Sequence, residues 1–325
     1  MIHGVVNISQ ESRTELLMED SGNLLKQSDT LWTRARMLRA IRDFFVNKDY
    51  LEVETPNLIP APIPEQHIDA ISCGGWFLHT SPELYMKRLL AVGYPRIFQI
   101  CKCFREGERG SCHLPEFTML EWYCRGMDYR LLMEECEELI ISIANNLGHE
   151  DVIHYQGKKI RLQRPWKSVS VRETFTRYAP VPMEEAVKES SFDEIMVCYI
   201  ESHLGLEQPT FIYDYPVSGS ALAKAKKEEP AVAERFELYI GGKEIANACS
   251  ELIDVDEHYI RFKKVQEYRR SIGKSVYPIP EHFLQDNIAM PESAGIALGV
   301  DRLAMIFCDS PIIDNVVTFT PELML

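Results

Sequence analysis

Two glutamates fall close together in one predicted hairpin, where their carboxylates could share a metal ion. Residues 236–250 form two strand-like runs joined by a Gly-Gly pair, the two-residue loop typical of a β-hairpin. In that register Tyr239 faces Glu244 and Glu237 faces Ala246, which makes the two glutamates diagonal neighbours roughly 7 Å apart. Mg²⁺ takes carboxylate oxygens together with substrate phosphates, so the pair is a candidate magnesium site. The alternative is two exposed strand glutamates, each paired with a lysine.

The second strand of this hairpin continues with polar residues at alternate positions. Asn247, Cys249 and Glu251 share one face, and strict alternation puts that face opposite Glu244. If all these side chains line one site, the strand needs a β-bulge near Ala246.

Two arginines stand where they could hold an anion. Arg105 ends one predicted strand and Phe117 lies in its partner. A guanidinium fork binds phosphate or carboxylate bidentately, and an aromatic ring can stack on a nucleobase. A core phenylalanine beside a surface arginine is the ordinary explanation of such a pair.

Arg302 falls in the first turn of a predicted helix, where the helix dipole does not favour a positive charge. The residues from Gly295 to Gly299 are small and let a backbone approach a ligand closely.

The hydrophobic pattern predicts the elements that must position these residues. We expect helices over residues 31–48, 81–91 and 128–147 and from 301, and strands over 51–55, 76–79, 96–105, 115–123 and 295–299, besides the hairpin. Asp29 or Thr30 can cap the first helix, and Ser81 followed by Pro82 is a helix-start signal. The simplest organisation is an extension over residues 1–30 and one continuous domain over 31–325.

Composition narrows the class of protein. The formal net charge of −14 lowers the expectation of a nucleic-acid binder, and no apolar run is long enough to span a membrane. The nine cysteines include no C-x-x-C pair, so we expect free thiols in a reducing, cytoplasmic compartment and no structural zinc. The chain has neither a P-loop nor a strand-linked G-x-G-x-x-G, so ATP would have to bind by another route.

Three segments carry a family resemblance. In order, DYLEVETPNL, CFREGERGSCHLPEFTMLEWY and GIALGVDRLAMIF resemble the three motifs of class II aminoacyl-tRNA synthetases, and within that class the lysyl type. HTSPELYMKRLL and ERFELYIGGKEIANACSEL are also similar to lysyl-type sequences. The resemblance spans about residues 31–310. It implies an α+β class II synthetase catalytic fold, with a six- or seven-stranded antiparallel sheet flanked by helices. It also implies a homodimer formed through the first motif, whose proline is Pro56.

The resemblance implies a two-step reaction and roles for individual residues. A carboxylate and ATP give an acyl-adenylate, and the acyl group then moves to a nucleophile. Arg105 and Arg302 would hold the phosphates, Phe117 would stack on adenine, and Glu237 and Glu244 would bind Mg²⁺. The implied ATP-binding residues are Arg105, Glu106, Glu108, His113, Glu116, Phe117 and Arg302. The implied amino-acid-binding residues are Glu83, Glu121, Tyr123, Asn247, Cys249, Glu251 and Ala297.

These roles are chemically consistent. The attacking carboxylate is already ionised, so catalysis is positioning together with neutralisation of the charge on the phosphate oxygens. Glu83 would contact the substrate's amino group near its carboxylate. Glu251 would meet the distal ammonium, and a buried carboxylate there would select a cationic side chain.

The sequence also departs from lysyl-tRNA synthetases. We expect no N-terminal anticodon-binding domain, because only about thirty residues precede the first predicted helix. Glu106 comes one position earlier than the usual glutamate, and Cys249 stands where an aromatic residue is common. Ala297 replaces the usual glycine and resembles the elongation factor P–(R)-β-lysine ligase family. That family transfers (R)-β-lysine to a lysine side chain of elongation factor P. We therefore expect a lysine-type substrate and elongation factor P as acceptor, without tRNA binding.

Two alternatives stay open at this point. One is a stand-alone lysyl-tRNA synthetase-like enzyme, which a basic patch beside the site would support. The other is a non-catalytic regulatory paralogue. Such proteins tend to lose the metal carboxylates or motif arginines, and this chain keeps both.

Overall fold

The computed structural model describes residues 27–220 and 222–324. Most of the expected extension over residues 1–30 therefore lies outside the described residues. The first described helix, α2 (Ser28–Val46), begins earlier than predicted. Its N-cap is Gln27, and Asp29 and Thr30 lie inside the helix, so the prediction that one of them caps it is wrong.

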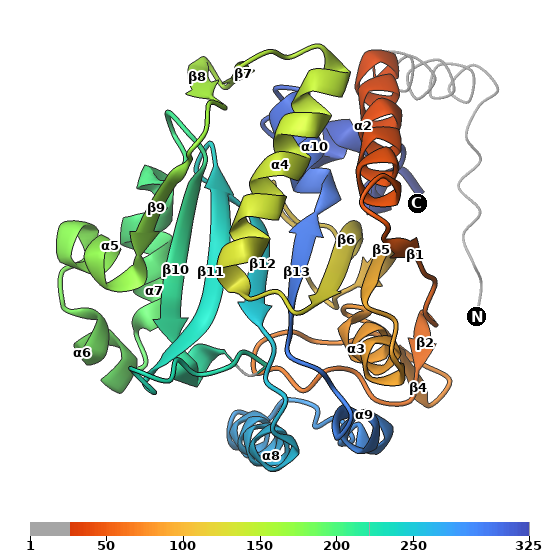
Figure 1. Cartoon of the computed structure of the whole chain (residues 1–325), viewed down its shortest axis with the longest axis vertical. Helices are drawn as coiled ribbons and strands as arrows, with labels where there is room; N and C mark the ends of the chain where they lie inside the picture. The colour runs from red at the N-terminus through yellow and green to blue at the C-terminus, as the bar shows by residue number, and fades with distance from the viewer. Residues whose placement is uncertain (1–26, 221, 325) are drawn as a thin grey trace, which may run out of the picture.

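The described residues form an eight-stranded mixed sheet (Figure 1). Its order is β1 (Leu51–Glu52), β5 (Arg96–Phe104), β6 (Glu116–Arg125), β13 (Ser293–Gly299), β12 (Lys243–Ser250), β11 (Val232–Ile240), β10 (Thr210–Pro216) and β9 (Lys167–Ser170). The six strands from β5 to β10 pair antiparallel, whereas β1 and β9 pair parallel with β5 and β10 at the two edges. The α+β class is confirmed, but the wholly antiparallel sheet is not, because a short parallel strand extends each edge.

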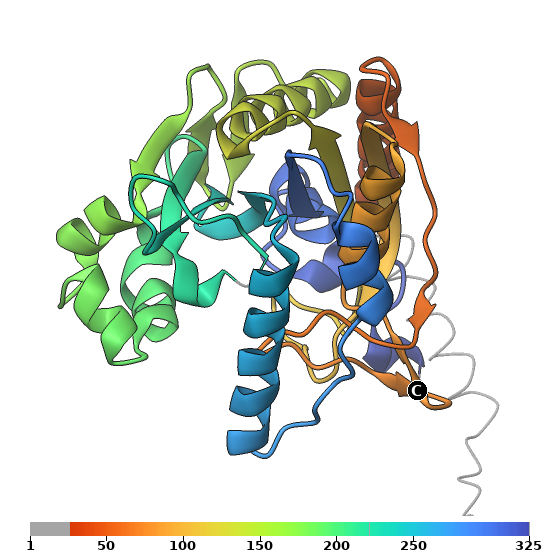
Figure 2. The same cartoon turned by 60° about the horizontal axis from the view of Figure 1, so that its bottom comes forward.

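Helices cover the sheet in groups. Figure 1 shows α4 (Tyr129–Leu147), α10 (Val300–Phe307) and α2 on one side of the strands, and they share a core with the central strands. Figures 1 and 2 place α3 (Glu83–Val92), α8 (Val255–Ser271) and α9 (Glu281–Asn287) at one end of the sheet. The helices α5 (Val171–Tyr178), α6 (Met183–Lys188) and α7 (Phe192–Ile195) flank the β9–β10 edge.

Helix ends follow the local sequence signals. The Asp128 carboxylate accepts hydrogen bonds from two backbone N–H groups at the start of α4, and Gly148 ends the helix with φ 84°. At α3 the hydroxyl of Ser81 accepts a hydrogen bond from the N–H of Glu83 at 3.0 Å. Gly93 ends that helix with φ 116°. Ser81 and Gly93 thus fix where α3 begins and ends, and this helix carries side chains of the site.

The remaining strands form two small sheets. One contains β2 (Leu58–Ile59), β4 (Trp76–Leu78) and β3 (Ser72–Cys73), and the other contains β7 (Val152–Tyr155) and β8 (Lys158–Arg161). All nine cysteines lie in the described residues, and none of them forms a disulfide. Among the described helices, none combines the length and apolar character needed to cross a membrane.

Candidate active site

Alternation along the central strands separates the core from a cavity of about 750 Å³. On β6, Leu120 and Trp122 are buried in the core, whereas Glu121 and Tyr123 line the cavity. Of the predicted site residues, the cavity is lined by Glu83, Arg105, Glu108, His113, Phe117, Glu121, Tyr123, Glu237, Glu244, Asn247, Cys249, Glu251, Ala297 and Arg302. The fold thus brings together side chains that are more than 200 positions apart in the chain.

Two predicted nucleotide-binding residues lie outside this lining. Glu106 is exposed, and its N–H donates to the carbonyl of Asp69 at 2.7 Å. Glu116 is exposed and lies 3.6 Å from the ammonium of Lys102. Their roles stay predictions. Glu108 is the glutamate of this loop that lines the cavity.

The β11–β12 hairpin contains the bulge that the polar pattern requires. Tyr239 pairs with Glu244 as predicted, and the register then shifts so that Leu238 pairs with Ala246. Ile245 is left as the extra residue of β12. The prediction of a bulge near Ala246 is confirmed.

The same bulge changes the partner of Glu237. This residue pairs with Asn247 and not with Ala246, so that part of the predicted register is wrong. The extra residue turns Asn247 and the polar positions after it to the same side of the sheet as Glu244. All of them therefore line one cavity.

The carboxylate of Glu237 is buried and accepts three hydrogen bonds. It accepts hydrogen bonds from the guanidinium of Arg235 at 2.5 Å and from the hydroxyls of Tyr215 at 2.7 Å and Tyr239 at 2.8 Å. Burial raises the pKa of Glu237 to about 7; Arg235 opposes this shift, and the charge of Glu244 adds to it. Sequence reasoning missed Arg235, although it alternates with Glu237 along the strand.

Glu237 and Glu244 fit a hard divalent cation. Both line the same cavity, and the effect of Glu244 on the pKa of Glu237 shows that the two charges lie close enough to repel. Carboxylate oxygens are the ligands that Mg²⁺ prefers, and a dication would relieve this repulsion. Glu244 also accepts a hydrogen bond from Arg302 at 3.3 Å.

Arg105 presents an available cation to the cavity. Its guanidinium lies 4.9 Å from the ring centroid of Phe117 and 3.7 Å from Glu108. Its Nε is buried and has no hydrogen-bond partner among the described residues. A buried, unpaired donor on a cationic side chain favours an anionic ligand.

Arg302 joins the loop after β5 to the hairpin. It donates to the carbonyl of Glu244 at 3.0 Å, to the carbonyl of Cys112 at 3.3 Å and to Nε2 of His113 at 2.5 Å. Burial and the charge of Arg302 lower the pKa of His113, so the neutral imidazole can accept this bond. The charge of Arg105 lowers this pKa as well, so both arginines lie near His113 in the cavity lining.

Another part of the cavity lining is acidic. Glu121 is 1% exposed and accepts hydrogen bonds from the hydroxyls of Ser81 at 2.6 Å and Tyr123 at 3.0 Å. Burial raises the pKa of Glu121 well above its usual range, and the charge of Glu83 raises it further. Burial likewise raises the pKa of Glu251 to about 7.

A buried lysine that the sequence analysis missed lies behind two of these carboxylates. Lys87 is 1% exposed, and its ammonium lies 2.5 Å from both Glu83 and Glu251. Burial opposes its charge, but the attraction of Glu251 and Glu83 outweighs burial and raises the pKa of Lys87. Lys87 does not line the cavity, so it holds the two carboxylates from behind.

This part of the cavity therefore has more carboxyl groups than cations. Glu83 and Glu251 share the buried Lys87, whereas Glu121 has no ion pair with it. Uncompensated buried carboxylates are costly, so the arrangement favours a ligand that carries ammonium groups. The predicted contact of Glu251 with such a group stays a prediction.

Gly295 permits the close packing in this acidic part of the lining. A Cβ at this position would lie 2.5 Å from Oε1 of Glu251 and closer still to the ring of Tyr123. Overpacking a buried site typically costs about 1–3 kcal/mol. We expect Gly295→Ala to lower the free energy of unfolding by that amount, about 1–3 kcal/mol.

Gly299→Ala is the matched control for this substitution. The atoms nearest to a Cβ there are side-chain atoms of Arg302, at 3.8 Å, which is an ordinary contact. Urea unfolding of both variants checks the prediction. Equal effects at the two glycines would contradict it.

Comparisons with known proteins agree with this geometry. Residues 20–322 match the family model for tRNA synthetases class II (D, K and N). The chain is 35% identical over 302 residues to an elongation factor P–(R)-beta-lysine ligase from Photobacterium profundum, covering 88% of this chain and 94% of that protein.

Lysine–tRNA ligases are similar over a comparable length of this chain. The protein from Burkholderia cenocepacia is 34% identical over 322 residues, covering 90% of this chain and 63% of the relative. The protein from Moorella thermoacetica is 35% identical over 316 residues, covering 88% of this chain and 64% of the relative. The chain thus spans slightly less than two thirds of these ligases.

Proposed function

Since this chain belongs to the family of class II tRNA synthetases (D, K and N), we propose that it is an ATP-dependent ligase that activates a lysine-type amino acid as an adenylate. One observation carries the proposal. The cavity is lined both by Arg105, which has an unpaired buried donor, and by a group of carboxylates, of which Glu83 and Glu251 share one buried lysine. A ligand with a carboxylate at one end and ammonium groups at the other complements both.

The residues of this cavity would bring the reacting groups together. Glu83 and Glu251 hold the substrate's ammonium groups, which directs its carboxylate towards Arg105. Arg105 and Arg302 then neutralise the charge that develops on the phosphate oxygens. The substrate carboxylate attacks in its ionised form, so no general base is needed. When bound by Glu237 and Glu244, Mg²⁺ would supply further charge neutralisation.

We propose that the substrate is (R)-β-lysine and that the acceptor is a lysine side chain of elongation factor P. The relative bearing that name matches nearly along its whole length. Ala297 lies between Glu121 and Asn247 in the sheet register, so its methyl group borders the amino-acid end of the cavity. The net charge of −14 also fits a protein partner better than a tRNA. Such an acceptor would place the reaction in the cytoplasm.

The second candidate is lysine–tRNA ligation, which the names of the other relatives favour. A regulatory role without catalysis is less well supported, because the cavity contains both arginines and both candidate metal carboxylates.

Substrate-dependent ATP–pyrophosphate exchange tests the proposed activity. We expect exchange with (R)-β-lysine to exceed exchange with L-lysine, and transfer to purified elongation factor P to exceed charging of bulk tRNA. Preference for L-lysine together with robust tRNA charging would establish the second candidate. No exchange with any amino acid would contradict the activation chemistry itself.

The ionisation of Glu251 gives this activity a pH signature. Its pKa is about 7, and only the ionised carboxylate can pair with a substrate ammonium. The kcat/KM for the amino acid should therefore rise about tenfold per pH unit below pH 7 and level off above it. Glu251→Gln should raise the KM for the amino acid far more than the KM for ATP and should flatten this rise.

The control is the pH dependence of kcat/KM for ATP, measured at varied ATP concentration. It is needed because Glu237 titrates in the same pH range as Glu251. A Glu251→Gln variant that keeps the full pH dependence for the amino acid would contradict this role.

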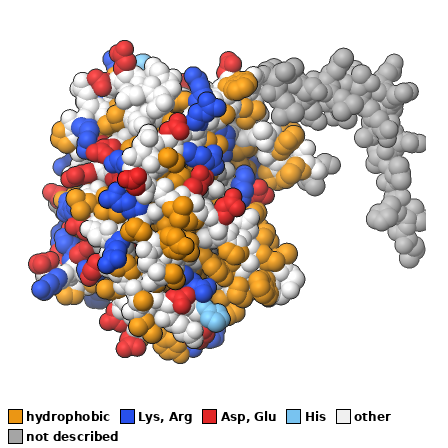
Figure 3. Space-filling model, turned by 45° about the vertical axis from the view of Figure 1, so that its right-hand side comes forward, with side chains coloured by type: hydrophobic (Ala, Val, Ile, Leu, Met, Phe, Trp, Pro, Cys, Tyr) orange, Lys and Arg blue, Asp and Glu red, His pale blue; other side chains and the backbone are white. Residues whose placement is uncertain are grey.

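We propose that the protein is a homodimer formed on the side of α2, β1 and α3. Figure 3 shows hydrophobic side chains gathered on this side of the molecule. Exposed hydrophobic residues on these and adjacent elements include Val46, Leu51, Leu58, Trp76 and Val92. Surface hydrophobic patches of this kind mark interaction sites. Sedimentation equilibrium should give twice the chain mass, and Trp76→Glu with Val92→Glu should give the chain mass; a monomeric wild-type protein would contradict the proposal.

A further inference from the structure

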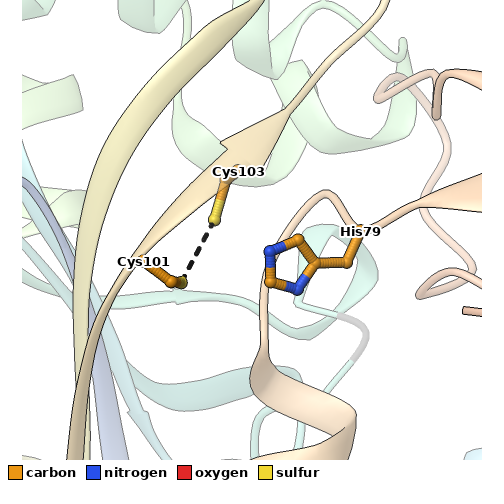
Figure 4. Close-up of side chains that lie close together, drawn as sticks. All are labelled: His79, Cys101 and Cys103. Atoms are coloured by element: carbon orange, nitrogen blue, oxygen red, sulfur yellow. Dashed lines mark hydrogen bonds between the residues drawn. The ribbon is translucent and has the colours of Figure 1, made fainter. Parts of the chain in front are cut away.

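A histidine and two cysteines from separate elements meet beside β5 (Figure 4). Cys101 and Cys103 share one face of this strand, and their Sγ atoms lie 3.9 Å apart. His79 follows β4, and its imidazole points towards the two sulfurs. The ligand atoms of the three side chains all lie within 4.8 Å of one another. His79 and Cys103 are fully buried.

The spacing of the sulfurs suits a metal ion. Two sulfurs on a tetrahedral zinc ion lie roughly 3.8 Å apart, because each Zn–S bond is about 2.3 Å long. A third sulfur is close, since Sδ of Met119 lies 4.0 Å from Sγ of Cys103. Met119 also pairs with Cys101 across the β5–β6 ladder. Thiolate, thioether and imidazole donors together favour soft ions over Mg²⁺.

The imidazole is held in place by its surroundings. The backbone of His79 is fixed on both sides. Its backbone N–H donates to the carbonyl of Asn57 at 2.8 Å, and its backbone carbonyl accepts from the N–H of Phe104 at 3.0 Å. Nε2–H of the ring donates to the carbonyl of Lys102 at 2.6 Å. Nδ1 is buried and has no partner among the described residues. Coordination through Nε2 would move the single ring proton to Nδ1.

We propose that His79, Cys101 and Cys103 bind one thiophilic metal ion, Zn²⁺ or Cu⁺. On binding, each thiol releases its proton to solvent and each sulfur forms a bond to the ion, with no change in oxidation state. The thioether of Met119 favours Cu⁺ of the two. The spacing rules applied to the sequence do not find this site, because it combines a C-x-C pair with a histidine from another sheet.

The ion would connect two walls of the active site. His79 lies two residues before Ser81, whose hydroxyl donates to Glu121. Cys103 lies two residues before Arg105. Metal binding would therefore fix the segment that precedes α3 against the strand that carries Arg105. This inference concerns binding alone and does not depend on the proposed function.

Chelator competition tests the site on the full chain. The reduced, metal-stripped protein is titrated with Zn²⁺ against a chromophoric chelator, and anaerobically with Cu⁺ against a Cu⁺-specific chelator. We expect one ion per chain, and an affinity lowered by on the order of 100-fold or more in the Cys101→Ser, Cys103→Ser double variant. The ion that the protein binds with the higher affinity is the one assigned to the site. The matched control is Cys73→Ser with Cys198→Ser, which removes two exposed thiols.

The proposal is overturned if the wild-type chain retains no ion against either chelator, or if the two double variants bind equally well. A second measurement needs no variant and so does not depend on variant folding. The ion should protect the partly exposed Cys101 of the wild-type protein from alkylation, mapped by mass spectrometry, while the exposed Cys73 and Cys198 react as before. Unchanged labelling of Cys101 would also overturn the proposal.

Discussion

Replacing Arg105 with alanine is expected to lower the rate of amino-acid-dependent ATP–pyrophosphate exchange by about 10²–10³-fold. The physical reason is the position of its guanidinium in the cavity, where Nε is buried without a partner among the described residues and the planar group lies over Phe117. Preorganised donors of this kind stabilise charge that develops on phosphate oxygens. Their loss lowers kcat, because no water can replace a positive charge fixed by the protein.

Arg105→Lys separates charge from geometry in this prediction. Lysine keeps the charge but lacks the fork that binds oxygen atoms bidentately and the plane that stacks on Phe117, so we expect it to recover only part of the rate. Arg109→Ala is the matched control from the same loop. Arg109 pairs with Asp314 at 2.8 Å and Glu322 at 2.9 Å and does not line the cavity. A comparable loss in the control, or full activity in Arg105→Ala, would contradict the assigned role.

Strand periodicity allowed much of the cavity to be predicted from the sequence. Along β6 the apolar residues Leu120 and Trp122 alternate with Glu121 and Tyr123, and this alternation separates core from cavity. The bulge at Ile245 could be predicted only conditionally: the strand needs it if all the polar side chains are to line one site. The consequence for the partner of Glu237 was missed, because one extra residue reverses every later position of the strand.

Other features depend on tertiary contacts that one sequence does not reveal. Glu106 and Glu108 are equally plausible ligands in the sequence, and only the loop conformation turns Glu108 to the cavity. Lys87 follows Glu83 by four residues, a spacing that indicates an ion pair on one helix face. Such pairs usually lie on exposed faces, so the spacing does not predict that Lys87 is buried. Glu65 lies in an irregular segment without any pattern, yet it lines the cavity, and burial raises its pKa.

Replacing Lys87 with methionine is expected to lower the free energy of unfolding by about 3–5 kcal/mol, the usual cost of removing one partner from a buried ion pair. Methionine fills a similar volume but leaves Glu83 and Glu251 without their shared cation. Urea unfolding measures this loss. Arg88→Met is the control from the next position of α3, because Arg88 pairs with Asp286 on the surface. Surface pairs contribute about 0–1 kcal/mol, so the control should cost little.

The same substitution should move the pH dependence of catalysis in a way that simple destabilisation cannot. Lys87 lowers the pKa of Glu251 against the effect of burial, so its removal should raise that pKa further above 7. The rise in kcat/KM for the amino acid should then shift to higher pH in Lys87→Met and stay unchanged in Arg88→Met. In the double variant Lys87→Met, Glu251→Gln, the shift should disappear and part of the lost stability should return, since the uncompensated carboxylate is gone. An unshifted profile in Lys87→Met would show that Lys87 supports the fold without positioning the charge that recognises the substrate.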